Sequence, residues 1–285
     1  MNSSRSLDPE YLRRQVGAWL AEDVGRGDVT TNSVVPPGRI GRARLEAREQ
    51  CTVAGVDAAA MCFELASGGA LEFKALVTDG SEIEAGEVIA RIEGGLAPIL
   101  TAERTALNII ARLSGVATAT RSYTRALDGT GAGILDTRKT TPGLRMLQKY
   151  AVVVGGGHNH RFGLDDGILI KDNHVAAAGG VGAAVRGALE NAPMGLKVEV
   201  EVTMLAELDE ALSAGAHAIL LDNMSPEMVA EAVAKAGGRV VLEVSGGINL
   251  ETIRSYAVTG VDFISVGALT HSSPTIDLAL EIEEQ

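Results

Sequence analysis

The segment between residues 137 and 171 concentrates cationic side chains that could bind an anion. It holds six lysines and arginines against two acids, in a chain whose formal net charge is −12. A local positive field in an acidic protein indicates a focused anion-binding pocket. Arg145 and Lys149 are expected on a helix, away from that pocket. The candidate anion ligands are therefore Arg138, Lys139, Arg161 and Lys171, with His160 beside them.

Two acidic residues are candidates for holding a sugar or a metal. Lys197, Glu199 and Glu201 alternate with valines, so they share one face of an expected strand, and that face should point into the interior. An unpaired charge there is costly, which favours a Lys197–Glu199 pair. Glu201 and Asp222, at the ends of successive strands, carry the carboxylate oxygens that suit a sugar diol or Mg²⁺. An equally open alternative pairs Glu201 with Lys171.

Two glycine-containing loops are candidates for holding a phosphate. Ser245, Gly246 and Gly247 follow one expected strand and open a helix, and Gly267 and Ala268 follow the last strand. Glycine lets backbone N–H groups approach a phosphate, and a helix N-terminus adds a favourable dipole. Phosphate sites in βα barrels are frequently formed by these final loops. The alternative is that the glycines only cap helices and form turns.

Other chemistries have less support from residue spacing. The His158-x-His160 pair has no further ligand at a zinc-site spacing and stands among cations, which argues against zinc. Lys171 has the amine needed for a Schiff base, but its basic neighbours favour anion binding. Cys51 and Cys62 are expected to be buried small residues rather than nucleophiles.

From about residue 115 the chain alternates β-prone and helical segments. This alternation implies a parallel sheet, because parallel strands need a crossover connection. Seven units favour a barrel or near-barrel, whose active site lies at the carboxyl ends of its strands. The candidate strands are 134–137, 151–154, 168–171, 197–202, 217–221, 239–244 and 262–266, and the candidate helices are 175–190, 204–214, 226–236 and 250–258.

The first part of the chain has the pattern of a small α/β layer. A helix over 8–22 has Asp8 as its cap and Pro9 in its first turn. The domain boundary is expected near 112–118, where a long helix should end. The other expected elements are strands at 43–47, 71–77 and 88–92, a helix at 56–65 and the long helix at 99–114.

Length and composition restrict the class of protein. The 285 residues, 46% of them hydrophobic, suffice for one large domain or two moderate ones. The acidic balance and the 3% of aromatic residues argue against nucleic-acid binding, and the charge argues against docking on anionic lipid. The sequence has no stretch of roughly 18 apolar residues without a charge, so no membrane span is implied. We expect a cytoplasmic enzyme or binding protein.

A series of motifs, in order along nearly the whole chain, resembles the quinolinate phosphoribosyltransferases, also called carboxylating nicotinate-nucleotide pyrophosphorylases. The segments are 22–31 (EDVGRGDVTT), 102–108 (AERTALN), 136–143 (DTRKTTPG), 155–161 (GGGHNHR), 170–174 (IKDNH), 198–201 (VEVE), 221–223 (LDN) and 243–248 (EVSGGI). The resemblance implies an α/β protein with an N-terminal α/β sandwich at 1–115 and a C-terminal open (βα) barrel of about seven strands at 116–285. The C-terminal tail is free to return to the first domain. A two-fold homodimer, or a larger assembly of such dimers, is also implied.

The same resemblance implies a pentosyltransferase of NAD biosynthesis. Phosphoribose from PRPP would pass to the nitrogen of quinolinate, and loss of a ring carboxylate as CO2 would give nicotinate mononucleotide and pyrophosphate. Mg²⁺ is the implied cofactor, held by Glu201 and Asp222 directly or through water. These two acids, with Lys139 and Lys171, are the implied catalytic residues.

By this resemblance, quinolinate is bound by cationic side chains, because arginine grips carboxylates bidentately. Arg104 would reach the pocket from the partner subunit, and the final glycine loops would hold the 5′-phosphate of PRPP. The full set of implied substrate-binding residues is Arg104, Thr137, Arg138, Lys139, His160, Arg161, Lys171, Glu201, Asp222, Ser245, Gly246, Gly247, Gly267 and Ala268.

Two other functions remain open. A related transferase could act on another base, but a monocarboxylate needs fewer cations than the pair Arg138 and Arg161 supplies. A protein that binds or senses a phosphate ligand without turnover is the third hypothesis. The acids Glu201 and Asp222 would be superfluous in such a protein.

Overall fold

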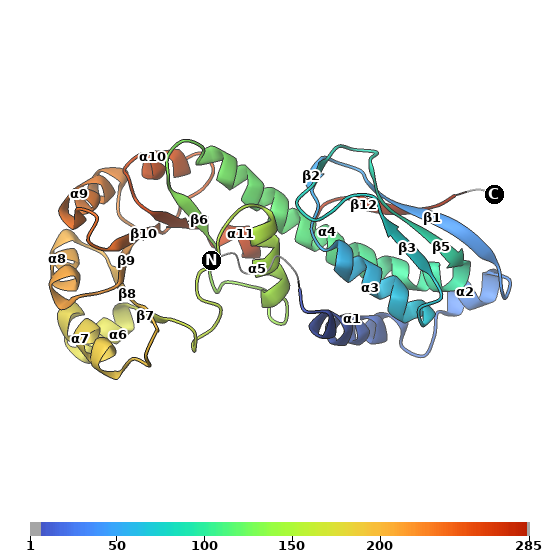
Figure 1. Cartoon of the computed structure of the whole chain (residues 1–285), viewed down its shortest axis with the longest axis horizontal. Coiled ribbons are helices and arrows are strands. Elements are labelled where there is room, and N and C mark those ends of the chain that lie inside the picture. Colours follow the sequence, from blue (N-terminus) through green and yellow to red (C-terminus); the bar gives the residue numbers. More distant parts are fainter. Residues whose placement is uncertain (1–6, 284–285) are drawn as a thin grey trace. The chain divides into compact units, whose positions relative to one another are not determined.

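The computed structural model describes residues 7–283, which fall into two units (Figure 1). The first, here called the sandwich unit, comprises 7–119, 146–156 and 273–283. The second, the barrel unit, comprises 120–145 and 157–272. The long helix α4, Leu96–Ala126, contributes residues to both units.

The sandwich unit is built on an antiparallel sheet whose strand order is β12-β1-β5-β3. The last strand of the chain pairs with β1, so the C-terminal segment belongs to this sheet. Its strands are β1 (Ile40–Ala47), β3 (Glu72–Ala75), β5 (Val88–Gly95) and β12 (Leu278–Glu283), and β2 (Cys51–Thr52) pairs separately with β4 (Glu82–Ile83). Its helices are α1 (Pro9–Val24), α2 (Val29–Val34), α3 (Val56–Ser67), most of α4, and α5 (Arg145–Val154).

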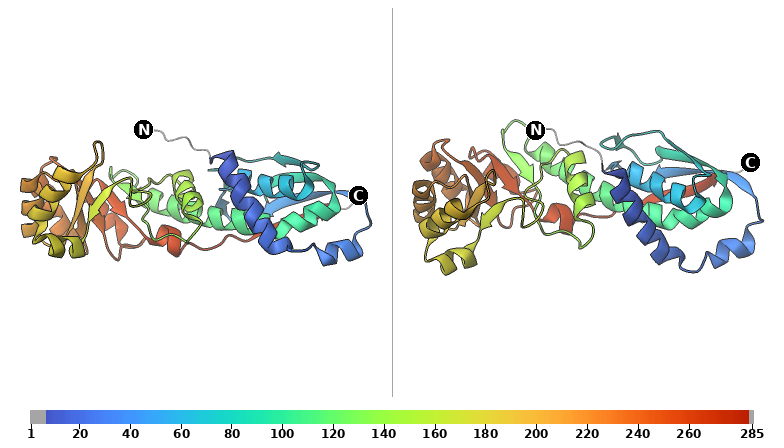
Figure 2. Two further views of the ribbon diagram at one scale, coloured as in Figure 1. Left: turned by 90° about the horizontal axis from the view of Figure 1, so that it is seen from below. Right: turned by 60° about the horizontal axis from the view of Figure 1, so that its bottom comes forward.

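Alternation along β1 from Gly41 to Leu45 separates the two faces of this sheet, up to a register shift between Leu45 and Glu46. Ala43 and Leu45 are buried in the core with residues of α1, α3 and α4, and these helices lie along the sheet in Figure 2. Arg42 and Arg44 point to the opposite face, where Arg42 pairs with Glu93 of β5. The period of two in the sequence therefore fixes which face packs against helices.

The barrel unit contains a six-stranded parallel sheet in the order β6-β11-β10-β9-β8-β7. Helices α8, α9 and α10 lie on the outer side of the curved sheet (Figure 1). The strands are β6 (Gly133–Leu135), β7 (Ile168–Ile170), β8 (Val198–Val202), β9 (Ala218–Asp222), β10 (Val241–Ser245) and β11 (Phe263–Ser265). The helices are α6 (Asp172–Ala178), α7 (Val181–Asn191), α8 (Leu205–Ala214), α9 (Pro226–Ala236), α10 (Ile253–Ala257) and α11 (Ala268–His271).

The fold class predicted from the sequence is confirmed, but the number of barrel strands differs. A single parallel bridge between Leu135 and His158 stands where a seventh strand would lie beside β6. The expected strand at 151–154 is wrong, because these residues form the end of helix α5. Their β-branched side chains favour a strand, but Leu147 and Ala151 recur at helical spacing and both are fully buried. Packing thus overrides local propensity.

The expected end of the long helix near 112–118 is also wrong, because α4 continues to Ala126. Gly115, within the expected end region, lies inside the helix. A Cβ on Gly115 would come 1.8 Å from the carbonyl oxygen of Pro274. This glycine therefore permits the close approach of the segment that leads to β12, and it does not end the helix.

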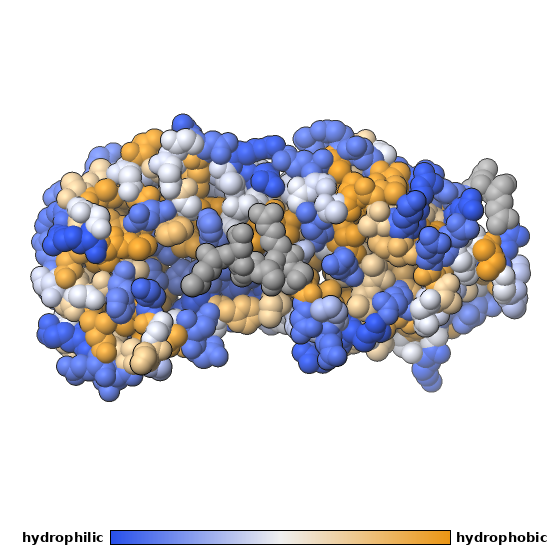
Figure 3. Space-filling view, viewed as in Figure 1, coloured by the Kyte–Doolittle hydropathy of each residue, from blue (hydrophilic) through white to orange (hydrophobic). Residues whose placement is uncertain are grey.

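The expected helix at 175–190 is two helices, α6 and α7. Gly179 and Gly180 both adopt positive φ values, of 84° and 132°, and interrupt the helical path. In the described residues no helix is long and apolar enough to cross a membrane. The face shown in Figure 3 mixes hydrophilic and hydrophobic residues.

Candidate active site

A cavity of about 900 Å³ opens at the carboxyl ends of the barrel strands. This is the place where βα barrels carry their active sites. The structure brings together thirteen of the fourteen predicted site residues in its wall: Thr137, Arg138, Lys139, His160, Arg161, Lys171, Glu201, Asp222, Ser245, Gly246, Gly247, Gly267 and Ala268. Eight further residues line it: Leu169, Leu220, Asn223, Glu243, Ile248, Ser265, Val266 and His271.

Arg138 and Arg161 form the cationic part of this cavity. The Nε atom of each is buried and has no hydrogen-bond partner among the described residues. Burial, and next the charge of Arg138, lowers the pKa of Arg161, whose Nη1 donates to the carbonyl of Gly167 at 2.9 Å. Two guanidinium groups with unused buried donors are arranged to receive an anion with two acceptor groups.

Lys171 and Glu201 lie at the ends of the neighbouring strands β7 and β8. The ammonium nitrogen of Lys171 is 3.1 Å from Oε2 of Glu201, so the alternative pairing considered from the sequence is present. Both residues nevertheless line the cavity, and Lys171 is about half exposed, at 49% of its side chain. The pair can therefore meet a ligand without leaving the site.

Asp222, at the end of β9, is oriented by its neighbour Asn223. The Asn223 side-chain amide donates to Oδ2 of Asp222 at 2.7 Å, and the backbone N–H of Asn223 donates to the carbonyl of Ser245 at 2.9 Å. Asn223 is the non-glycine residue with a positive φ (53°) in the described chain. A Cβ on Gly246 would lie 2.2 Å from Oδ1 of Asn223. Gly246 therefore makes room for the residue that orients Asp222.

Lys139 and His271 lie against the last glycine loop. A Cβ on Gly267 would come 3.1 Å from Cδ of Lys139 and 3.1 Å from Nε2 of His271. The hydroxyl of Thr270 donates to the backbone carbonyl of Lys139 at 2.8 Å, which ties the loop after β6 to α11. Both nitrogen-bearing side chains thus border the predicted phosphate loop. His271 was not among the predicted site residues, because its position in the sequence belongs to no motif.

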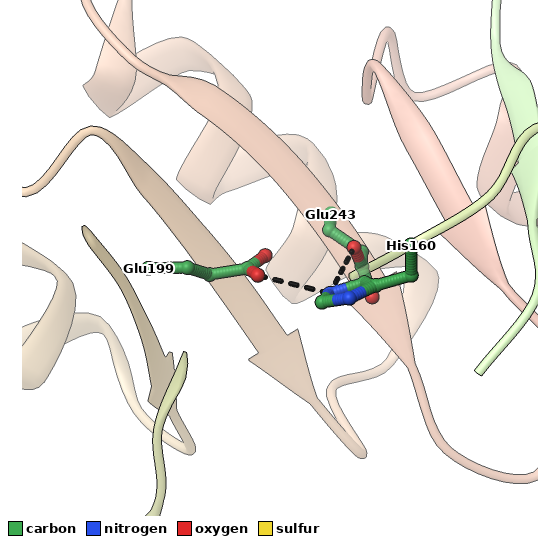
Figure 4. Close-up of side chains that lie close together, drawn as sticks. All are labelled: His160, Glu199 and Glu243. Atoms are coloured by element: carbon green, nitrogen blue, oxygen red, sulfur yellow. Dashed lines mark hydrogen bonds and ion pairs between the residues drawn. The ribbon is translucent and has the colours of Figure 1, made fainter. Parts of the chain in front are cut away.

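His160, Glu199 and Glu243 form a cluster of close side chains (Figure 4), and two of them, His160 and Glu243, line the cavity. Nε2 of His160 is 2.9 Å from Oε2 of Glu199 and 3.5 Å from Oε2 of Glu243. Desolvation, then the charge of Glu199, raises the pKa of Glu243 to about 7. The expected Lys197–Glu199 pair is wrong in the described chain, because His160 is the partner of Glu199.

The tautomer of His160 is fixed by its own neighbours. The backbone N–H of Arg161 donates to Nδ1 at 2.7 Å, so the ring proton belongs on Nε2, which donates to Glu199. In this state the Nδ1 lone pair of His160 accepts the Arg161 N–H. His158 contacts Phe263 edge-on, with 6.0 Å between ring centroids. The argument against zinc at His158-x-His160 stays a prediction from the sequence.

The segment that carries His160 and Arg161 is held by Asp136, which is fully buried. One carboxylate oxygen of Asp136 accepts from the backbone N–H of His160 at 2.9 Å, and the other accepts from the Asn159 amide at 2.6 Å. Asp136 follows β6 directly. It therefore fastens this segment to the sheet at the point where the seventh strand is missing.

Several residues considered in the sequence analysis lie outside the cavity. Arg104, the fourteenth predicted site residue, lies on α4 in the sandwich unit with 64% of its side chain exposed, and it does not line the cavity. Arg145 and Lys149 lie on α5, as expected, but Lys149 is buried rather than on the surface. Burial raises the pKa of Cys51 to about 11 and that of Cys62 to about 12, so neither is a ready nucleophile.

Two protein-family models together match most of the chain. Residues 28–114 match the N-terminal domain of quinolinate phosphoribosyl transferase, and residues 116–281 match the C-terminal domain. The protein of Mycobacterium leprae named nicotinate-nucleotide pyrophosphorylase (carboxylating) is 45% identical over 278 residues, 96% of this chain and 98% of that protein. A Synechocystis protein with the name "probable nicotinate-nucleotide pyrophosphorylase (carboxylating)" is 43% identical over 267 residues, 93% of this chain and 90% of that protein.

Solved structures give the same assignment. The nicotinate-nucleotide pyrophosphorylase of Francisella tularensis superposes with a TM-score of 0.94 at 41% identity, covering 99% of this chain and 100% of that one. The resemblance inferred from the motifs is thereby confirmed, and this chain belongs to the quinolinate phosphoribosyl transferase family.

Proposed function

We propose that this chain transfers phosphoribose from PRPP to the ring nitrogen of quinolinate and releases CO2, giving nicotinate mononucleotide and pyrophosphate in NAD biosynthesis. It is thus a decarboxylating pentosyltransferase. The observation that carries this function is the pair of buried, unpartnered Nε atoms of Arg138 and Arg161 in the strand-end cavity. Two fixed guanidinium groups match the two adjacent carboxylates of quinolinate. Each charge-assisted hydrogen bond contributes about 1.5–3 kcal/mol.

The remaining cationic groups suit the second substrate. Lys139 and Lys171 line the cavity and would supply the positive charge that a pyrophosphate leaving group needs. The loops at Gly246 and Gly267 present backbone N–H groups to a 5′-phosphate. No residue needs to act as a nucleophile in this step. Catalysis is then positioning together with electrostatic stabilisation of the charge that develops on the ribose and the leaving group.

Mg²⁺ is the cofactor we propose, and the residues present fit it. Glu201 and Asp222 supply oxygen donors from neighbouring strands, and both line the cavity. Mg²⁺ is usually held by one or two carboxylates together with substrate phosphates, so a third protein ligand is not required. When bound, the ion would neutralise charge on pyrophosphate. Asn223 leaves Oδ1 of Asp222 for the ion or for a ribose hydroxyl, since its amide bonds Oδ2.

We also propose a homodimer, or an assembly of dimers, in which Arg104 of one subunit completes the cavity of the other. The exposed Arg104 side chain on α4 supports this arrangement, because it is available to a partner. No nucleic acid or membrane partner is proposed. The cytoplasmic location remains a prediction from the sequence.

The function is tested by supplying quinolinate, PRPP and Mg²⁺ to the purified protein and measuring CO2 together with nicotinate mononucleotide. Equal amounts of both products are expected. Nicotinate in place of quinolinate is the control, since it lacks one carboxylate and should give little product. Turnover of nicotinate at the rate of quinolinate would instead favour a transferase for another base.

A further inference from the structure

Glu243 is the most deeply buried charged residue of the cavity wall. It lies on β10 at 3% exposure, and its Oε1 atom has no hydrogen-bond partner among residues 7–283. A buried carboxyl oxygen without a partner is costly unless a ligand or a proton satisfies it. Because Glu243 lines the cavity, a bound substrate can supply the missing hydrogen-bond partner.

The groups that face Glu243 come from each neighbouring element. Glu199 of β8 and His160 of the 158–161 segment contact it, and Ser265 of β11 donates a hydrogen bond to it. On β9 its register partner is Leu220, which is apolar. Nε2 of His160 lies 3.5 Å from Oε2 of Glu243, and the charge of this histidine lowers the pKa of the Glu243 carboxyl group, against the larger effects of burial and of Glu199. The cluster therefore holds two carboxyl groups and one histidine, and the charge of Arg161 reaches it through Glu199.

Quinolinate adds two negative charges to this region. Placing a dianion beside two ionised, buried carboxylates opposes binding, since like charges in a low-dielectric site repel strongly. Protonation of one carboxyl group removes most of that repulsion. Of the two, Glu243 is the one that takes the proton, because it is the more buried and Glu199 accepts the hydrogen bond of His160.

We propose that Glu243 is a further substrate-binding residue, which binds quinolinate as a neutral acid and donates a hydrogen bond from its free oxygen to a substrate carboxylate. Each bound quinolinate then takes up one proton in mildly alkaline solution. This role rests on the proposed function. It adds a contribution of protonated Glu243 to quinolinate binding and no step of the reaction.

The direction of the pH effect follows from linkage. Burial raises the pKa of Glu243 in the free protein to about 7, and a bound dianion raises that pKa further. Below the lower value the proton is already present, so binding is independent of pH. Above it, quinolinate affinity falls with increasing pH, by up to about tenfold per pH unit.

The experiment is calorimetric titration of the wild type and of Glu243→Gln from about pH 6 to about pH 8.5, in two buffers of different ionisation enthalpy. Quinolinate is titrated alone. Phthalate, with the same two carboxylates on a ring without nitrogen, is titrated in the presence of PRPP and Mg²⁺. Glu46→Gln is the matched control, because Glu46 is a buried glutamate of the sandwich unit, paired with Arg44 and Arg48.

The wild type and Glu46→Gln should bind quinolinate and phthalate more weakly as the pH rises above 7. In the same range, the number of protons taken up per bound ligand should approach one. Glu243→Gln, neutral at every pH, should show no uptake and should bind more tightly than the wild type at about pH 8.5. A structural role alone would weaken the variant at every pH. Ser265→Ala gives a second test, because loss of a hydrogen bond that lowers the pKa of Glu243 moves the affinity loss to higher pH.

Proton uptake that persists in Glu243→Gln, or a wild-type affinity that does not change with pH, overturns this role and leaves the proposed function intact. A wild type that binds neither quinolinate nor phthalate at any pH overturns both.

Discussion

Oε2 of Glu201 lies 3.1 Å from the ammonium nitrogen of Lys171, so the carboxyl ends of β8 and β7 meet in one ion pair inside the cavity. The sequence left two uses open for Glu201, the pair with Lys171 and contact with a sugar or Mg²⁺. The geometry makes them compatible, because both side chains line the same cavity. In the absence of substrate each residue satisfies the charge of the other.

This relationship predicts coupled effects on turnover. Lys171→Ala and Glu201→Gln should each lower kcat by about 10²-fold. The double variant should lose much less than the product of the two, because the residues act as one unit. Steady-state kinetics of the four proteins measures the coupling. The exposed pair Lys235 and Asp209 is the control, and its variants should leave kcat within about twofold. Strictly multiplicative losses for Lys171 and Glu201 would contradict the coupling.

Arg138→Ala should weaken quinolinate binding by about 10- to 100-fold, since one or more charge-assisted hydrogen bonds are lost. PRPP binding should change by less than about threefold. Calorimetry with each substrate measures the difference. Arg13→Ala, which removes an exposed arginine paired with Glu64, is the control. Equal losses for both substrates would remove Arg138 from the quinolinate side of the cavity.

The proposed dimer predicts complementation between two inactive variants. A heterodimer of Arg104→Ala and Lys171→Ala subunits contains one site with both residues intact. Random mixing should therefore restore about a quarter of wild-type activity, since half of the dimers are mixed and half of their sites are complete. Activity is measured after the two proteins are unfolded and refolded together. If mixed dimers, isolated through a different affinity tag on each subunit, remain inactive, Arg104 does not act across the interface.

Gly246→Ala should reduce the free energy of unfolding more than Gly247→Ala does. Both glycines have positive φ values, of 106° and 63°, so both variants strain the backbone. Only the first would also place a Cβ 2.2 Å from Asn223, whereas the second meets no atom within 4 Å. The added loss should be about 1–3 kcal/mol. Denaturant unfolding measures it, and equal losses would show that Asn223 moves aside freely.

The cavity wall was largely predictable because parallel strands place their carboxyl ends together. Reading the residues after each expected strand identified Lys171, Glu201, Asp222 and the loops at Gly246 and Gly267, and all of them line one cavity. This inference needed only strand positions accurate to a residue or two. Predicting which side chains pair requires the three-dimensional structure. For Glu201 the sequence alone could not decide between a pair with Lys171 and contact with a ligand.

The features that were missed depend on contacts between distant segments. Glu199 was assigned to Lys197 because they share a strand face, but its partner His160 arrives from a loop. Gly115 lies in the range where the long helix was expected to end, and its role becomes visible only in the structure, where Pro274 lies against it. Residues 151–154 were predicted as a strand because of the β propensity of their valines. They form the end of helix α5, because burial of Leu147 and Ala151 outweighs that propensity.

The central claim is that one cationic cavity seats both anionic substrates side by side. A crystal structure of the protein with phthalate, PRPP and Mg²⁺ tests it most directly. The account predicts phthalate carboxylates on Nε of Arg138 and Arg161, with the 5′-phosphate of PRPP on the backbone of the loops at Gly246 and Gly267. Phthalate bound outside the barrel cavity, or PRPP phosphates on the two arginines, would contradict it.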